Sequence, residues 1–234
     1  MILIIIIVSA ALYAFSYILS KKSGQTIFSM LMGLIFAAAL VLLTVNFTDH
    51  FGMEKVSKEK TMDLVSSAGA DSGMDVLLYQ PIGTGDEKVY LYQTAGAKKP
   101  KPTDTEKTSN VVESADKAQL VVEKISWKYT NNFYKALFAF AGNDNQLEEV
   151  VNHFKIPDTW ATLSVDQVKE LQKLATERQV DMAKTMQAAI QQEVMAAMKK
   201  NPKMTKAEQQ ALVEKLTAEK KAEAMQALIA EVTK

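Results

Sequence analysis

Two long apolar runs open the sequence, and everything that follows them is mixed in polarity. Residues 2–19 and 27–45 are almost wholly apolar and contain no charged residue. Each run comes close to the ~20 residues, rising ~1.5 Å each, that an α-helix needs to cross a ~30 Å hydrocarbon layer. The pattern therefore predicts a membrane domain over residues 1–46, with transmembrane helices at about 2–19 and 27–45 joined by a basic turn at 20–26.

A signal peptide would also begin with an apolar run, but it carries a basic region first and a small-residue cleavage site afterwards. Here apolar residues start at the second position and a second run follows at once, so we expect an uncleaved hairpin. Lys21 and Lys22 lie in the turn, and positive charge in short loops marks the cytoplasmic side. We therefore expect the soluble part outside the cytoplasm. The reverse orientation is the alternative, because Lys55, Lys58 and Lys60 follow the second run.

Small residues recur at four-residue spacing along both apolar runs. They are Ala10, Ala14, Ser29, Gly33 and Ala37. Such spacing lets helix backbones approach closely in lipid, where no hydrophobic effect drives association. We favour packing of the two helices on each other, and the alternative is a face that docks another membrane protein. Ionisable residues inside a membrane mark ion or proton paths, so their absence from both runs argues against a carrier or channel.

Residues 47–160 predict a small antiparallel β-rich domain after a juxtamembrane segment that reaches about residue 60. Runs at 75–80 and 88–93 flank a turn rich in Gly, Pro and Asp, which is typical of a β-hairpin. Residues 120–141 have β character, and the alternation over 121–129 places Ile125 and Trp127 inward. The polar stretch at about 95–117 cannot bury a core and predicts a mobile loop. Residues 147–156 are ambiguous between helix and strand.

Residues 161–234 predict two long helices, at about 165–200 and 206–233. Each begins with a capping box, formed by Ser164 with Gln167 and by Thr205 with Glu208. An Asn-Pro pair at 201–202 separates the helices. The apolar stripe on them is thin and rich in alanine and methionine.

Four residues of this stripe are candidates for a partner-binding surface: Met182, Met186, Met225 and Ile229. Methionine adapts to irregular partners. We favour an antiparallel helical hairpin that packs on itself, and an arm that binds a partner is the sharper alternative. A methionine copper site is weakly indicated, because the methionines are not clustered in short motifs.

Composition excludes several functions. Lys+Arg and Asp+Glu are equal at 27 each, so the chain lacks the basic field of a nucleic-acid-binding domain. Cysteine is absent, which excludes disulfides and thiolate chemistry, and only two histidines occur. No catalytic, nucleotide-binding or metal-binding motif is present in the sequence. We therefore expect no enzymatic activity, no cofactor, no metal and no nucleic-acid partner.

The order of these features resembles a known family. After the apolar hairpin come GMDVLLYQ at Gly73–Gln80, KVYLY at Lys88–Tyr92 and MAAMKKNPKMT at Met195–Thr205. In this the chain resembles the two-span membrane proteins of lactic acid bacteria that are classed only as a domain of unknown function. The resemblance covers essentially the whole chain and implies a bacterial plasma-membrane protein. It supplies no catalytic residues.

The sequence thus predicts a membrane-anchored α+β protein with a transmembrane helical hairpin, a β-rich domain and a long C-terminal helical hairpin. We expect a non-enzymatic envelope scaffold or an accessory subunit of a membrane complex such as a transporter. Its partners would be the bilayer and another membrane protein or a second copy. The alternative is a small-ligand-binding module or cryptic envelope enzyme with its site among the aromatic residues Tyr79, Tyr90, Tyr92, Trp127 and Tyr129.

Overall fold

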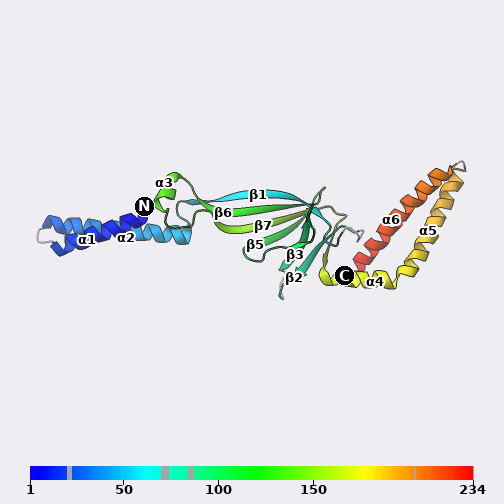
Figure 1. The fold of residues 1–234 in the computed structure, drawn as a ribbon, viewed down its shortest axis with the longest axis horizontal. Helices are drawn as coiled ribbons and strands as arrows, with labels where there is room; N and C mark the ends of the chain where they lie inside the picture. Colours follow the sequence, from blue (N-terminus) through cyan, green and yellow to red (C-terminus); the bar gives the residue numbers. More distant parts are fainter. Residues whose placement is uncertain (20–22, 70–73, 84–86, 203, 234) are drawn as a thin grey trace. The chain divides into compact units, whose positions relative to one another are not determined.

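A computed structural model describes residues 1–19, 23–69, 74–83, 87–202 and 204–233 of this α+β chain (Figure 1). The chain forms two compact units, each assembled from separate stretches of sequence. The first contains residues 1–63, 104–113 and 117–155, and the second contains 64–103, 114–116 and 156–234. The strands predicted for a single domain at 47–160 are therefore divided between the two units.

The first unit begins with helices α1 (Ile2–Leu19) and α2 (Ser23–Asp49), which lie side by side (Figure 1). α2 is long and apolar enough to cross a membrane, and α1 is a shorter apolar helix. α2 starts four residues before the predicted position and ends four residues after it, because no proline breaks the helical pattern over this range. The predicted turn at 20–26 is correspondingly shorter, and the topology residues Lys21 and Lys22 lie outside the described part of the chain.

The sheet of the first unit has the strand order β5-β7-β6-β1. Its strands are β1 (Met53–Val65), β5 (Thr108–Ser114), β6 (Gln119–Tyr129) and β7 (Gln146–Ile156). β6 pairs antiparallel with both neighbours, so Trp127 lies opposite Lys55 on β1 and Gln146 on β7. β1 starts inside the predicted juxtamembrane segment, and the ambiguous run at 147–156 is a strand.

A short helix, α3 (Asn132–Leu137), follows β6 where the sequence predicts further β structure. The Asn131 side chain caps it by accepting a hydrogen bond from the Tyr134 backbone N–H, 3.1 Å away. This local cap favours a helix start over continued strand. Phe138, just after α3, is fully buried and packs with Ile2 of α1 and Ala39 of α2. The aromatic run thus covers the ends of the apolar helices.

The second unit contains β2 (Val76–Pro81), β3 (Lys88–Thr94), β4 (Lys101–Pro102) and β8 (Ala161–Ser164). The predicted β-hairpin is confirmed, because β2 and β3 pair antiparallel with Tyr79 opposite Tyr90. β8 pairs with β2 in parallel, so the prediction of a purely antiparallel sheet is wrong. The helical region consequently begins at 165, because residues 161–164 belong to the sheet.

The predicted loop at about 95–117 contains all of β4 and β5. β4 pairs with β3, and the carbonyl of Lys107, beside the start of β5, accepts a hydrogen bond from the backbone N–H of Val150 on β7. These short polar strands are held by distant partners. The prediction of a loop fails here because β-branched residues are few, Val111 and Val112 on β5 among them, and polar residues surround them.

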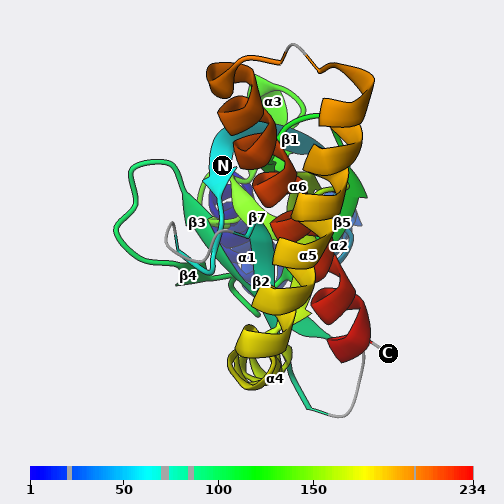
Figure 2. The same ribbon diagram turned by 90° about the vertical axis from the view of Figure 1, so that its right-hand side faces the viewer.

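Three helices complete the second unit: α4 (Val165–Glu177), α5 (Gln179–Lys200) and α6 (Lys206–Val232). Both predicted capping boxes are present, at Ser164 and Thr205. The single helix predicted over 165–200 is wrong, because the chain turns at Arg178 and α4 and α5 run in different directions (Figure 1). Packing explains the turn: Leu171 of α4 is buried with Val76 and Leu163 of the sheet, while α5 lies along α6 (Figure 2).

Candidate functional site

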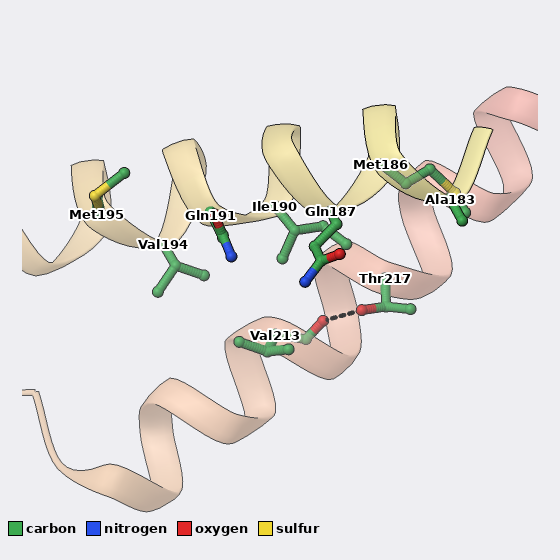
Figure 3. A pocket seen from close by; sticks show the side chains of 9 residues that line it. All are labelled: Ala183, Met186, Gln187, Ile190, Gln191, Val194, Met195, Val213 and Thr217. Atoms are coloured by element: carbon green, nitrogen blue, oxygen red, sulfur yellow. Dashed lines mark hydrogen bonds between the residues drawn. The ribbon is translucent and has the colours of Figure 1, made fainter. Parts of the chain in front are cut away.

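An open groove of about 570 Å³ lies between α5 and α6 in the second unit (Figure 3). α5 contributes seven lining residues between Ala183 and Met195, and α6 contributes Val213 and Thr217. The α5 residues recur at intervals of three and four, so helical periodicity places them on one face. The groove is therefore a property of the two helices alone and lies wholly within the second unit.

The groove closes toward the α4 end of the hairpin because larger side chains fill the space there. Leu228 and Val232 of α6 are buried with Leu171 of α4, and Met182 and Ile229 pack against this cluster. Farther along, the groove is lined by apolar residues of α5 such as Met186 and Ile190, opposite Val213 of α6. These side chains form an apolar trough that is open to water.

Two ion pairs connect α6 to the preceding helices. The Arg178 guanidinium donates to both carboxylate oxygens of Glu231 at 2.7 and 2.8 Å, and this pairing raises the pKa of Arg178. The Lys220 ammonium lies 3.1 Å from Glu193 on α5, and hydrogen bonds to Glu193 and then Glu223 raise the pKa of Lys220. Both pairs lie at the surface, with Lys220 half-buried, so each contributes little to stability.

The groove is lined by uncharged side chains. Its lining residues include no Asp, Glu, Lys, Arg or His. Its polar groups are the uncharged Gln187, Gln191 and Thr217, and the Thr217 hydroxyl already donates to the Val213 carbonyl at 2.7 Å (Figure 3). General acid–base catalysis needs a titratable group within reach of the substrate. The geometry thus suits apolar contact with a few polar groups at the edge.

The predicted partner-binding stripe is only partly available. Met182, Met225 and Ile229 pack against the buried cluster of the second unit, so they are occupied within the fold. Met186 alone of the four lines the groove. The groove also contains Ile190, Val194 and Val213, which were not among the residues predicted from the sequence. Their helical spacing marks them as apolar positions on one face of each helix. Only the pairing of α5 with α6 shows which of these positions the neighbouring helix leaves uncovered.

The junction between α2 and the sheet of the first unit is a second organised region. Asn46 of α2 is fully buried, and its amide donates to the Phe51 carbonyl at 2.8 Å. The Asn46 side-chain oxygen accepts from the Asn143 amide at 3.0 Å, and the Tyr129 hydroxyl donates to Asn143. Burial is the main cause that raises the pKa of Tyr129. This network joins α2 to β6 and to the chain after α3.

Of the predicted helix-packing residues, Ser29 is buried and a Cβ at Gly33 would lie 3.2 Å from the Tyr13 ring, so both lie where α1 and α2 meet. Ala10 is half-buried, whereas Ala14 and Ala37 are exposed and lie outside this interface. The sequence missed Ser9, Ala39 and Asn46, which are buried. Ser9 and Asn46 could have been found as polar residues in apolar helices, because such residues face inward in membrane proteins.

The five aromatic residues proposed for a ligand site do not form one cluster. In the second unit, Tyr79 and Tyr90 lie 6.1 Å apart between ring centroids. In the first unit, Trp127 stacks on His50 at 4.0 Å and donates to Glu148 at 2.9 Å, while Tyr129 belongs to the junction network. These contacts give the four aromatic residues structural roles within their own units. The fifth, Tyr92, lies on β3.

Metal binding finds no support among the described residues, which contain no group of three or more His, Cys, Asp or Glu side chains placed to hold an ion. His153 lies 3.0 Å from Glu113 and 3.7 Å from Glu123, so it bridges two carboxylates across neighbouring strands. Such a pairing stabilises the sheet without an ion.

Comparison with known proteins gives one match. A family model described as a domain of unknown function (DUF4811) matches residues 21–171, well over half of the chain. The matched range includes α2, every strand and the first turns of α4, and it excludes α5 and α6. No curated protein and no solved structure matches the chain.

Proposed function

The chain belongs to the family described as a domain of unknown function (DUF4811), and we propose that it is a membrane-anchored interaction protein of the bacterial envelope. In this proposal α1 and α2 both cross the plasma membrane and the soluble part lies outside the cytoplasm. The groove between α5 and α6 binds an apolar helix of a partner protein, so that the chain serves as a scaffold or accessory subunit of a membrane complex.

Membrane anchoring rests on the surface of the helical hairpin. Outward-facing residues of α2 include Met30 and Leu34, which are 75% and 64% exposed, while the polar Ser29 and Asn46 are buried. In water, apolar residues would be buried and polar residues exposed. In lipid, apolar residues face outward and polar residues are buried, as they are here. α1 lies along α2, and its 18 residues extend ~27 Å, close to the hydrocarbon thickness.

The interaction function rests on one observation, the open apolar groove without charged lining residues. Amphipathic helices commonly bind in such troughs through apolar anchors at helical spacing. Methionines such as Met186 and Met195 adapt to the shape of a bound helix. A helix of a partner fits the groove better than a small polar ligand, since the few polar groups lie among apolar ones.

Orientation can be tested with single cysteines, because the chain contains none of its own. Gly24→Cys lies at the start of α2 and Val180→Cys lies on α5 at an exposed position. On intact cells a membrane-impermeant maleimide should label Val180→Cys and leave Gly24→Cys unlabelled until the membrane is opened. Labelling of both or of neither on intact cells contradicts the proposed topology.

Partner binding can be tested by placing a photoreactive amino acid at Ile190, inside the groove, in the native cell. Gln192 is the matched control, because it is exposed on the same helix about 200° away from Ile190 by helical periodicity. We expect an adduct from Ile190 that maps to an apolar helix of another protein, is absent from Gln192 and is lost when Val194→Asp is added. An adduct with a second copy of the chain, an equal adduct from Gln192, or none contradicts the proposal.

A further inference from the structure

Large aromatic side chains are exposed around α3 in the first unit. Phe133 on α3 is 69% exposed, and Phe140, three residues after α3, is 70% exposed. Phe47 and Phe51, at the end of α2 and just after it, are also exposed. Exposed apolar groups that gather in one region mark an interaction surface, and the proposed groove on α5 and α6 does not involve any of them.

Contacts within the first unit place α3 beside the ends of the apolar helices. The backbone nitrogen of Met1 donates to the carbonyls of Ala136 and Leu137 at 2.9 and 3.0 Å. Phe138 packs with Ala39 of α2. The chain leaving α2 also passes close to α3, because a Cβ at Gly52 would lie 2.7 Å from the Tyr134 ring. α3 therefore lies against the last turns of α2.

The length of α2 defines the environment of these last turns. Its 27 residues extend ~40 Å, about 10 Å more than the hydrocarbon layer, and α2 continues four residues past the apolar run at each end, so both ends can reach the headgroup region. The polar residues Thr48 and Asp49 lie at the end that contacts α3. Aromatic side chains are enriched at that depth, where their rings lie among the headgroups.

We propose that α3 and residues 138–142 form a membrane-interface foot, in which Phe133 and Phe140 insert into the headgroup and upper acyl region of the leaflet where α2 leaves the bilayer. The inference rests on the proposed anchoring of α2. The bilayer is the occupant because ring contacts connect Phe133 through Tyr134 to Phe51, just after α2, with centroids 5.5 and 5.6 Å apart. Lys135 is the cation of this foot: it is exposed, pairs with Asp144 at 3.0 Å and lies at headgroup depth.

The buried network gives the foot a fixed depth. Asn46 of α2 binds Asn143, which follows the foot in sequence, so α2 and the foot move together. An anchored helix alone would leave its tilt undefined, because tilt is set by packing and by interfacial anchors. The foot supplies a second point of contact, and the sheet of the first unit takes its orientation from both.

The test measures depth in the full chain reconstituted into phosphatidylcholine–phosphatidylglycerol nanodiscs. An environment-sensitive fluorophore is attached to Phe133→Cys or Phe140→Cys, one at a time, in the otherwise cysteine-free chain. The control is Thr61→Cys, which is exposed on β1 and lies ~27 Å along the strand from Met53. Spin labels near the headgroup or in mid-chain of the lipid quench the fluorophore according to its depth.

We expect blue-shifted emission at 133 and 140, with quenching by headgroup-proximal spin labels at least about twofold stronger than at 61, since interfacial aromatics lie at that depth. Equal quenching at the three positions overturns the foot. Leu34→Cys carrying the same fluorophore separates the two proposals. Strong mid-chain quenching at 34 without quenching at 133 and 140 removes the foot alone, whereas no quenching at 34 removes the anchoring.

Discussion

The two helical hairpins of the chain, α1 with α2 and α5 with α6, bury opposite kinds of residues. α2 and α6 are each 27 residues long. α2 buries Ser29 and Asn46 and exposes leucine, methionine and phenylalanine, whereas α6 buries Leu216 and Leu228 and exposes lysine and glutamate. The two hairpins share a backbone form, and the proposed anchoring gives them different surroundings, lipid for the first and water for the second.

The difference shows how the solvent determines which residues a helix pair buries. In water, burial of apolar area drives packing, at roughly 25 cal/mol per Å². In lipid that force is absent between helices, so small and polar contacts hold them together. At the contact between α1 and α2, a Cβ at Gly33 would lie 3.2 Å from the Tyr13 ring. The buried Ser9 hydroxyl donates within α1 to the Ile5 carbonyl at 2.6 Å, and Asn46 joins α2 to the chain that follows through hydrogen bonds. Each following prediction changes one residue on one hairpin or beside it to test this contrast.

The largest effect is expected from Leu228→Ala on α6. Leu228 is buried in the cluster at the α4 end of the hairpin, and truncation of its side chain leaves a cavity. Buried Leu→Ala changes destabilise proteins by about 2–5 kcal/mol, so denaturant unfolding of the second unit should shift by this amount. Val213→Ala, at a partly exposed position, is the control and should cost less than about 1 kcal/mol. Equal effects would mean that the cluster is not the core of the unit.

The next effect is expected from Leu34→Lys on the exposed face of α2. If this face contacts lipid, a charge there should raise the free energy of membrane insertion by about 2.5–3.5 kcal/mol. The fraction of chain that resists alkaline extraction from membranes should fall. Ala211→Lys on the exposed face of α6 is the control and should change stability by less than about 0.5 kcal/mol. Unchanged extraction of Leu34→Lys would place α2 in water.

A smaller effect is expected from Asn46→Ala. The change leaves the Phe51 carbonyl without its partner and removes the acceptor of the Asn143 amide. Unsatisfied buried polar groups cost about 1–3 kcal/mol, so the thermal unfolding temperature in mild detergent should fall accordingly. Thr44→Ala is the control, because the Thr44 hydroxyl donates to the Leu40 carbonyl within α2, and its unfolding temperature should fall by much less. A neutral Asn46→Ala would show that the junction does not depend on this network.

The elements that could be predicted from the sequence are those determined by residues close together in the chain. The apolar runs, the β2–β3 hairpin and both capping boxes were predicted because spacing, turn residues and caps lie within a few positions of each other. β5, β8 and the turn at Arg178 were missed because distant partners determine them. β5 pairs with β7, and β8 pairs with β2. α3 was missed because its aromatic run fits a strand as well as a helix until the Asn131 cap is considered.

The candidate site was recovered less well than the fold. Of the four residues predicted as a partner-binding surface on the last two helices, only Met186 lines the groove, and the other three pack against the buried cluster. A single helix sequence shows which positions are apolar and does not show which of them a neighbouring helix covers. Ile190 and Val194 became visible as groove residues only once α5 and α6 were paired.

The smallest effect is expected from a change at Glu148, which alters how the stability of the first unit depends on acidic pH. Hydrogen bonds from Lys55 and then from Trp127 lower the pKa of Glu148 below its ordinary value of 4.5. A lowered carboxylate pKa stabilises the fold above the unfolded-state value, and this contribution is lost as the pH falls through the folded-state value. The unfolding temperature of Glu148→Gln should therefore fall less steeply than that of the unchanged chain as the pH drops below about 4.5. Glu208→Gln, at the α6 cap, tests the same effect in the water-exposed hairpin.

The most direct test of the contrast between the hairpins is labelling of single cysteines in native membranes with a water-soluble maleimide. Leu34→Cys on α2 and Ala211→Cys on α6 are both exposed in the fold. If lipid surrounds the first hairpin and water the second, Ala211→Cys should react in membranes opened to both sides, and Leu34→Cys should react only after denaturation in detergent. Rapid labelling of Leu34→Cys in intact membranes would contradict the account.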